Sequence, residues 1–228
     1  TDIFAFQELT KSKIDRFHAI KFDSKFNKFS SKSGQEEMHT FINNKFEVLN
    51  FSFDEFRKGR PYQMFLIKIK NNLIVFANCH AAKKIRKNSD QRPSGNKTIY
   101  FKDYQTLENS LKKLLSGNIS KFSKSNLRLI LAGDFNRDID FITLNNIKAT
   151  NIISAKERAE HYTCCNNFGS TIKNPFAFAD HILDSNYKVG STNYQINNSF
   201  KNTKKTIGPL INIGSDHTHI YANFLFNF

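Results

Sequence analysis

The sequence predicts an α/β (α+β) fold in which two packed mixed β-sheets are flanked by helices. Strand-like segments outnumber helix-like ones, hairpins occur beside longer crossover connections, and the helix-like segments lie between groups of strands. The chain has 228 residues and 39% hydrophobic content, which is enough for one sizeable core. The sequence contains no internal repeat, low-complexity tract or linker. We therefore expect residues 1–228 to form a single domain.

The N-terminal part of the chain predicts strands and one short helix. Residues 3–7 (IFAFQ) are typical of a short buried strand, and residues 10–17 can form a capped helix. Residues 46–53 alternate apolar and polar side chains, as a half-buried strand does. The β-rich runs 62–70 and 72–80 meet at a short polar connection, which indicates a hairpin.

The C-terminal part predicts helices between further strands. Residues 83–97 are polar and basic, which favours a surface loop. Residues 103–117 have leucines at helical spacing and end in glycine, so this is the best-supported helix. A buried strand follows at 127–133, and 138–146 resembles a short helix. The remaining predicted strands are 176–183, 188–196 and 217–226.

The charge balance indicates a polyanionic partner. Lys and Arg number 34 against 20 Asp and Glu, which gives a net charge of +14. Clustered positive charge accelerates encounter with phosphates and releases counterions on binding. The alternative is a compositional bias toward Lys, in which the lysines only solvate the surface. We expect nucleic acid, and DNA first, as the partner; a protein partner subunit stays open, and we expect a monomer.

Cysteine usage and hydropathy limit the compartments that fit the chain. Cys79, Cys164 and Cys165 form neither a disulfide framework nor a zinc-site spacing, which favours an intracellular, reducing compartment. A secreted protein stays open, because the chain begins without Met and its native N-terminus can be missing. No apolar run approaches the about 20 residues of a membrane span, so we expect no membrane insertion.

Several predicted strands end in side chains that bind metals or move protons. Taken singly, each has an ordinary explanation: an aspartate after a glycine forms turns, and a histidine at a strand end is usually structural. Together they supply what phosphodiester hydrolysis needs, namely oxygen ligands for a hard cation, a positioned water and an oriented imidazole. These residues are Glu8, His80, Asp134, Asn136, Asp180, Asp216 and His217.

Four motifs resemble the endonuclease/exonuclease/phosphatase superfamily, which includes deoxyribonuclease I and the abasic-site endonucleases. They are QE at residue 7, GDFN at 133, DHIL at 180 and SDH at 215, in this order along the chain. The resemblance implies a four-layer, deoxyribonuclease I-like sandwich with the active site at one edge of the two central sheets. It also implies a magnesium-dependent phosphodiesterase, most simply a DNA endonuclease, with Mn²⁺ or Ca²⁺ as alternative cations.

The resemblance assigns a role to each candidate residue. Glu8 and Asp216 match the metal-binding carboxylates, and Asp134 matches the aspartate that orients or deprotonates the attacking water. His217 matches the catalytic histidine, and Asp180 matches the carboxylate that orients it. Two other residues match groups that contact the substrate phosphate, namely Asn136 and His80.

A longer local match is similar to the nuclease subunit of cytolethal distending toxins. It covers GRPYQMFLIKIKNNLIVFANCHA, which contains Arg60, and a second local similarity is Arg137 directly after GDFN; both arginines are candidate phosphate-binding residues. The alternatives are a solvent-facing Arg60 and an Arg137 that pairs with Asp138.

Most members of the superfamily also have an asparagine-bearing strand before the QE motif, so we expect this chain to lack that N-terminal strand and the helix after it.

Two other functions fit parts of the same pattern. A phosphoinositide or sphingomyelin phosphoesterase would use the same chemistry, and a basic surface suits an anionic membrane. Inositol 5-phosphatases, however, carry a CDR pattern where this chain has FADHI at residue 178. A catalytically inactive binding module would keep the fold and lose the chemistry, although every readable catalytic position is present. No role follows for the adjacent Cys164 and Cys165.

Overall fold

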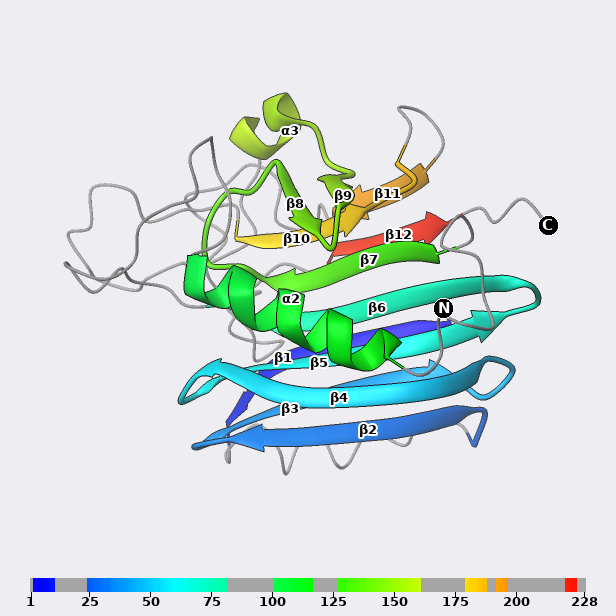
Figure 1. Ribbon diagram of the computed structural model, residues 1–228. Coiled ribbons are helices and arrows are strands. Elements are labelled where there is room, and N and C mark those ends of the chain that lie inside the picture. The colour runs from blue at the N-terminus through cyan, green and yellow to red at the C-terminus, as the bar shows by residue number, and fades with distance from the viewer. Residues whose placement is uncertain are drawn as a thin grey trace.

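The computed structural model describes seven segments of the chain, which are residues 2–10, 24–81, 101–116, 127–160, 179–187, 192–196 and 220–224 (Figure 1). The helix expected at 10–17 and the basic loop expected at 83–97 lie almost wholly outside these segments. The expectation of a missing N-terminal strand is not tested by them.

A seven-stranded mixed sheet forms the centre of the described structure. Its strands follow the order β4-β5-β6-β7-β10-β9-β8. The pair β6 and β7 is parallel, and the other neighbours are antiparallel. The strands are β4 (Glu47–Arg57), β5 (Arg60–Ile69), β6 (Asn72–His80), β7 (Leu127–Asp134), β8 (Phe141–Leu144), β9 (Ile147–Asn151) and β10 (Asp180–Asp184).

Two smaller antiparallel sheets cover one face of the central sheet. One has the order β1-β3-β2, and the other pairs β11 with β12. Hydrophobic residues of β1 and β12 pack against one buried cluster that includes Phe65, Ile74, Phe76 and Ile130 of the central sheet. The strands are β1 (Ile3–Thr10), β2 (Phe26–Ser33), β3 (Glu36–Asn43), β11 (Thr192–Ile196) and β12 (Ile220–Phe224).

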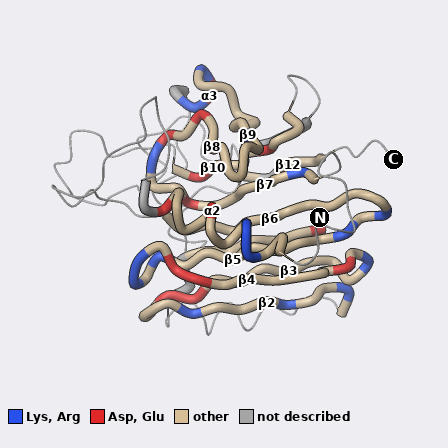
Figure 2. The backbone as a smooth tube through the Cα atoms, viewed as in Figure 1, with Lys and Arg blue, Asp and Glu red and all other residues tan. Residues whose placement is uncertain are grey.

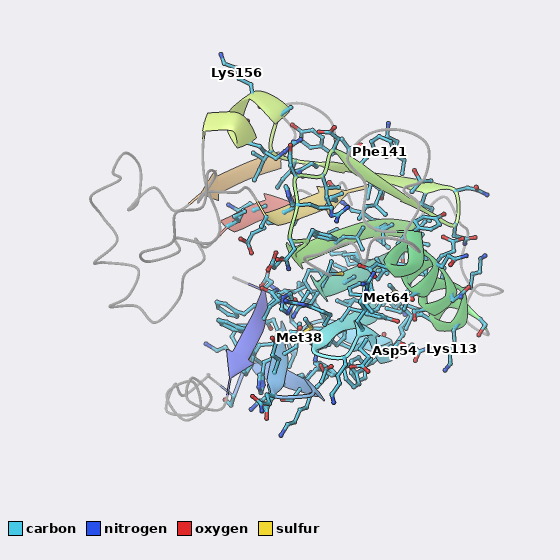
Figure 3. All side chains as sticks on the ribbon, turned by 90° about the vertical axis from the view of Figure 1, so that its left-hand side faces the viewer. Met38, Asp54, Met64, Lys113, Phe141 and Lys156 are labelled. Carbon is cyan, nitrogen blue, oxygen red and sulfur yellow. The ribbon has the colours of Figure 1, made fainter. Side chains whose placement is uncertain are left out.

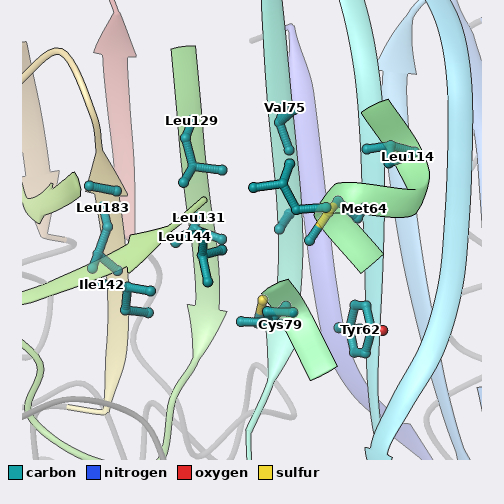
Figure 4. Packing of buried hydrophobic residues seen from close by; sticks show 14 of the residues in the cluster. Tyr62, Met64, Val75, Cys79, Leu114, Leu129, Leu131, Ile142, Leu144 and Leu183 are labelled. Atoms are coloured by element: carbon teal, nitrogen blue, oxygen red, sulfur yellow. The ribbon is translucent and has the colours of Figure 1, made fainter. Parts of the chain in front are cut away.

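Helix α2 (Phe101–Leu115) covers the opposite face of the central sheet. Its leucines at helical spacing, Leu107, Leu111 and Leu114, are buried against residues such as Met64 and Val75 (Figure 4). Figure 3 shows Met38 on the side of the three-stranded sheet and Met64 on the side of α2. Because both faces are covered, β5 and β6 are buried along most of their length. The second described helix is the short α3 (Ala155–Glu160).

Most of the predicted elements that fall in the described segments are confirmed. The hairpin of β5 and β6, helix α2 and the buried strand β7 lie where the sequence places them. The central sheet is mixed and helix-covered, as the fold class requires. Strands β2, β3 and β9 and helix α3 are additional to the prediction.

The short helix predicted at 138–146 is wrong. Residues 141–144 form β8, which pairs with β9 across a tight turn. The two turn residues, Asn145 and Asn146, have φ angles of 49° and 64°. Asparagine tolerates this left-handed conformation, and two such residues in succession match a hairpin turn that suits strand twist.

In the part of the chain that the structure describes, no helix combines the length and apolarity needed to cross a membrane.

Candidate active site

Five strand ends meet at one edge of the central and three-stranded sheets. In the parallel pair, His80 at the end of β6 lies opposite Asp134 at the end of β7. Asp180 opens β10 and is the antiparallel partner of Asp134. Arg60 opens β5, which runs antiparallel to β6. The structure therefore brings four of the predicted site residues to the same edge, and Glu36 joins them from the start of β3.

Gly133 allows β6 and β7 to approach closely beside the site. Its φ of +131° is unfavourable for residues with a side chain. A Cβ atom at this position would lie 2.1 Å from the carbonyl oxygen of Cys79. The glycine of the GDFN motif is thus required by the backbone contact that sets His80 beside Asp134.

Burial raises the pKa of the adjacent Cys79 thiol, with Asp103 adding to the effect, so the thiol stays protonated and is a poor nucleophile.

The Asp134 carboxylate is buried and held from both of its oxygens. Its Oδ1 accepts the backbone N–H of Asn136 at 2.6 Å, and its Oδ2 accepts the Asn136 side-chain amide at 3.0 Å. Oδ2 also lies 3.6 Å from Nε2 of His80. The side chain is only 3% exposed, so its orientation is fixed by these neighbours.

Asn136 joins the ends of β6 and β7. Its backbone φ is 55°, a left-handed conformation that asparagine adopts more easily than most residues. Its Nδ2 donates to Asp134 Oδ2 and, at 2.9 Å, to the carbonyl oxygen of Ala81. Both amide hydrogens are therefore used within the site. A contact between this amide group and a substrate phosphate would require one of these hydrogen bonds to be exchanged.

His80 is fully buried between charged groups. Its Nδ1 lies 3.1 Å from Oε2 of Glu36, and Nη1 of Arg60 contacts its Nε2. Nη1 of Arg60 also lies 3.3 Å from Nδ1 of His80. Arg60 therefore points into the site rather than into solvent. Its position beside His80 suits the phosphate-binding role predicted for it, which stays a prediction.

Strand β1 has an irregularity at the QE motif. Phe6 pairs with His39 and Leu9 with Glu37, so Gln7 and Glu8 together face the single residue Met38 of β3. Such a β-bulge re-aims side chains and is common beside active sites. The bulge lies in the half of β1 that ends at the site edge, where Thr10 pairs with Glu36. The side chain of Glu8 is outside the described part of the structure.

The loop after β7 is held by β9, β10 and α3. Nε2 of His181 contacts the carbonyl oxygen of Arg137 at 2.7 Å, and the backbone N–H of Asn151 donates to the carbonyl of Asp140 at 2.8 Å. Arg158 forms ion pairs with Asp138, at 2.5 Å, and with Asp140. The carboxylate of Asp138 is thus paired with the guanidinium group of Arg158 on α3. Burial lowers the pKa of His181 to about 4, which keeps its imidazole neutral.

The remaining predicted residues lie outside the described segments. These are Asp216 and His217, and the vicinal Cys164 and Cys165 lie outside them as well. Within the described segments, no group of three His, Cys, Asp or Glu side chains could hold a metal ion. Asp134 already binds the Asn136 amide groups, and Glu36 contacts His80. The metal ligands predicted here therefore stay Glu8 and Asp216, whose oxygen donors suit Mg²⁺.

Three residues that hold groups of the candidate site in place are additional to the sequence prediction. Glu36 lies on β3, which has no clear alternating pattern before the structure is known. His181 stands within the DHIL motif, from which only the aspartate was used. Asn151 ends β9, in the hairpin whose first strand was interpreted as a helix. Positive charge also lies next to the site, because Arg57, Lys58 and Arg60 surround the β4–β5 turn (Figure 2).

Comparison with known proteins identifies the fold. No protein-family model matches the sequence, and no curated protein matches it significantly. Truncated TDP2 from Caenorhabditis elegans has 16% identity and a TM-score of 0.62, over 99% of this chain and 84% of that chain. TDP2 from D. rerio, in a complex with single-strand DNA product, has 16% identity and a TM-score of 0.59, over 97% of this chain and 84% of that chain.

A third solved structure is similar over nearly the whole chain. It is the endonuclease/exonuclease/phosphatase from Bacteroides vulgatus, with 13% identity and a TM-score of 0.59, over 99% of this chain and 85% of that chain. Identities this low show the fold. The chain therefore has the deoxyribonuclease I-like fold of the endonuclease/exonuclease/phosphatase superfamily.

Proposed function

We propose that this protein is a magnesium-dependent phosphodiesterase that hydrolyses the backbone of nucleic acid, with DNA as the preferred substrate and internal cleavage as the mode. The observation that carries the proposal is the joint placement of Arg60, His80, Asp134 and Asp180 at one sheet edge. Fold alone does not determine a reaction, whereas oriented groups of the types that phosphodiester hydrolysis requires support one.

Asp134 is suited to align the attacking water. Its carboxylate is fixed by Asn136, so a water bound to it would meet the phosphorus along one direction. Arg60 supplies positive charge beside His80 for the phosphate oxygens, and Arg137 can add a second cation from the loop after β7. Preorganised donors of this kind stabilise the charge that develops in the transition state.

Glu8 and Asp216 would hold the cation, and a bound Mg²⁺ would neutralise charge on the phosphate. In this proposal Asp180 orients His217, which assists the leaving oxygen as a proton donor. The net charge of +14 favours association with a phosphate backbone. Support for DNA also comes from the similar fold of the D. rerio protein that was crystallised with a single-strand DNA product.

Nicking of supercoiled plasmid tests the proposal. We expect the purified protein to convert supercoiled DNA to the open-circular form with Mg²⁺ and to stop when the metal is chelated. Asp134→Asn should lower the rate by about 100-fold or more, because it removes the charge that aligns the water. Asp2→Asn is a matched control, since Asp2 is half exposed and pairs only at the surface with Lys45.

The substrate class is decided in a parallel assay. Release of inorganic phosphate from phosphoinositide vesicles, without plasmid cleavage, would identify a lipid phosphoesterase instead. A folded protein that hydrolyses neither substrate would contradict the catalytic assignment. Wild-type nicking by His217→Ala would remove that histidine from the mechanism.

A further inference from the structure

A buried imidazole on β10 touches the loop that carries two of the proposed phosphate-binding residues. We propose that His181 is a positioning residue: a neutral imidazole, oriented by Asn151, that fixes the Arg137 carbonyl and thereby the loop 135–140 that presents Asn136 and Arg137 to a substrate phosphate. The catalytic part of this inference rests on the proposed function. The arrangement of the imidazole rests on hydrogen-bond geometry alone.

The orientation of Asn151 determines which ring nitrogen of His181 carries the proton. Oδ1 of Asn151 accepts the backbone N–H of Ile153 at 3.0 Å, so its Nδ2 is the group that faces the loop. That Nδ2 donates to the carbonyl oxygen of Ile139 at 2.7 Å and contacts Nδ1 of His181 at 2.6 Å. Because an amide nitrogen only donates, Nδ1 of His181 accepts and carries no proton.

The other ring nitrogen then donates to the loop. With Nδ1 unprotonated, the hydrogen of the neutral ring is on Nε2, which donates to the Arg137 carbonyl at 2.7 Å. Protonation of Nδ1 would make the ring cationic and would place its new N–H against the side-chain N–H of Asn151, so the hydrogen bond between them would be lost. His181 is 1% exposed, so water cannot substitute for either hydrogen bond.

The Arg137 carbonyl lies in the middle of a loop that is also held at both ends. Phe135 donates its N–H to Ala179 at the start, and Asp140 accepts from Asn151 at the end, both at 2.8 Å. Between them lies Asn136, whose left-handed backbone makes the direction of the next peptide critical. His181 fixes that peptide, so its loss would free the Arg137 peptide next to Asn136 while the other contacts of the loop stay in place.

Charged groups around the ring come from three elements. Asp180 precedes it on β10, Asp138 lies in the loop, and Arg158 approaches from α3. The ring of Phe135 packs at 6.0 Å. The two carboxylates favour a protonated ring, and Arg158 and burial oppose it. A neutral ring can accept from Asn151 at Nδ1 and donate to the Arg137 carbonyl from Nε2.

Two measurements test the inference separately. Nitrogen-15 NMR of the imidazole should show the neutral Nε2–H tautomer of His181 at neutral pH in wild-type protein, whether or not the protein cleaves DNA. An Nδ1–H tautomer or a charged ring would overturn the inference and leave the proposed function standing. Absence of any hydrolysis by wild-type protein would overturn the proposed function and leave the tautomer assignment standing.

Kinetics then test the positioning role. His181→Leu fills the space of the imidazole with an apolar side chain and removes both of its hydrogen bonds. We expect kcat/KM for plasmid nicking to fall at least about tenfold, through a rise in KM more than a fall in kcat. His181→Gln keeps a donor that can reach the Arg137 carbonyl and should recover most of the loss. Leu114→Ala controls for stability, because it opens the buried α2 interface without touching the loop.

All three variants are assayed well below their melting temperatures, with folding verified by circular dichroism. If His181→Leu retains the kcat/KM of Leu114→Ala, the side chain serves packing only and the inference is wrong. A His181→Gln variant as impaired as His181→Leu would show equally that donation to the Arg137 carbonyl is not what matters.

Discussion

His181 makes the stability of the protein depend on pH in a definite direction. Burial lowers its folded-state pKa from 6.5 to about 4, so the unfolded chain binds a proton at a higher pH than the folded chain does. The stability associated with the neutral ring is complete above about pH 6.5 and is lost as the pH falls toward 4. The shift corresponds to about 3 kcal/mol of unfolding free energy at the acid end.

Urea unfolding at several pH values between 7 and 4 measures this contribution. We expect wild-type protein to lose about 3 kcal/mol more than His181→Gln over this interval, because glutamine does not titrate. Parallel pH profiles for the two proteins would show that His181 is not the group responsible.

Single residues also show how far the sequence determines the site. Asp134, Asn136 and His80 could be recognised because each follows a strand whose apolar run is visible in the sequence. Glu36, which contacts His80, and Asn151, which contacts His181, come from strands distant in the chain. Their contribution depends on tertiary contacts, which residue type and spacing do not encode.

At the scale of elements, a buried polar chain ties the two main layers together. Gln7 of β1 donates to Oδ1 of Asn78 on β6, and Nδ2 of Asn78 donates to Thr40 of β3 at 2.9 Å. Thr40 donates to Oε1 of Gln63 on β5 at 2.6 Å. Gln63 in turn donates to the Met38 carbonyl at 3.3 Å. Met38 is the residue opposite the bulge, so this series of hydrogen bonds starts and ends at the QE motif.

Thr40→Val tests the strength of this connection. Valine has the same shape but can neither accept from Asn78 nor donate to Gln63, and Thr40 is fully buried. Leaving two buried polar groups unsatisfied should lower the unfolding free energy by about 2 kcal/mol or more. Thr143→Val on the partly exposed β8 should change it by less than about 0.5 kcal/mol. Equal stability of the two variants, measured in urea, would contradict a structural role for the polar chain.

Elements differ in how well the sequence predicts them. Helix α2 and strands β5, β6 and β7 have strong apolar periodicity or long apolar runs, and the structure confirms them. Strand β2 alternates between exposed and more buried side chains from Lys28 onward, but its buried residues are Ser31 and Ser33, so the sequence shows little apolar alternation. The β8–β9 hairpin was missed because its short strands resemble a helical repeat. The Asn145-Asn146 pair, which favours positive φ, was the available indication of a turn.

For the whole molecule, the net charge makes binding sensitive to salt. With +14 on 228 residues, association with DNA should release many counterions. We expect the affinity for a short DNA duplex to fall by about tenfold or more between 50 and 200 mM salt. Fluorescence anisotropy in the presence of a metal chelator measures this without cleavage. An affinity that does not change with salt would indicate that the lysines only solvate the surface.

The parallel pairing of β6 with β7 has a consequence for the order of folding. His80 and Asp134 become neighbours only when the whole crossover connection that contains α2 has closed. Antiparallel hairpins such as β5–β6 form from adjacent segments, whereas a parallel pair must first overcome the entropy of a long loop. Contacts between distant parts of a chain form slowly. During synthesis, the hairpin that carries Arg60 and His80 can therefore form while Asp134 has yet to leave the ribosome, and this edge of the sheet lacks the Asp134 carboxylate until the fold closes.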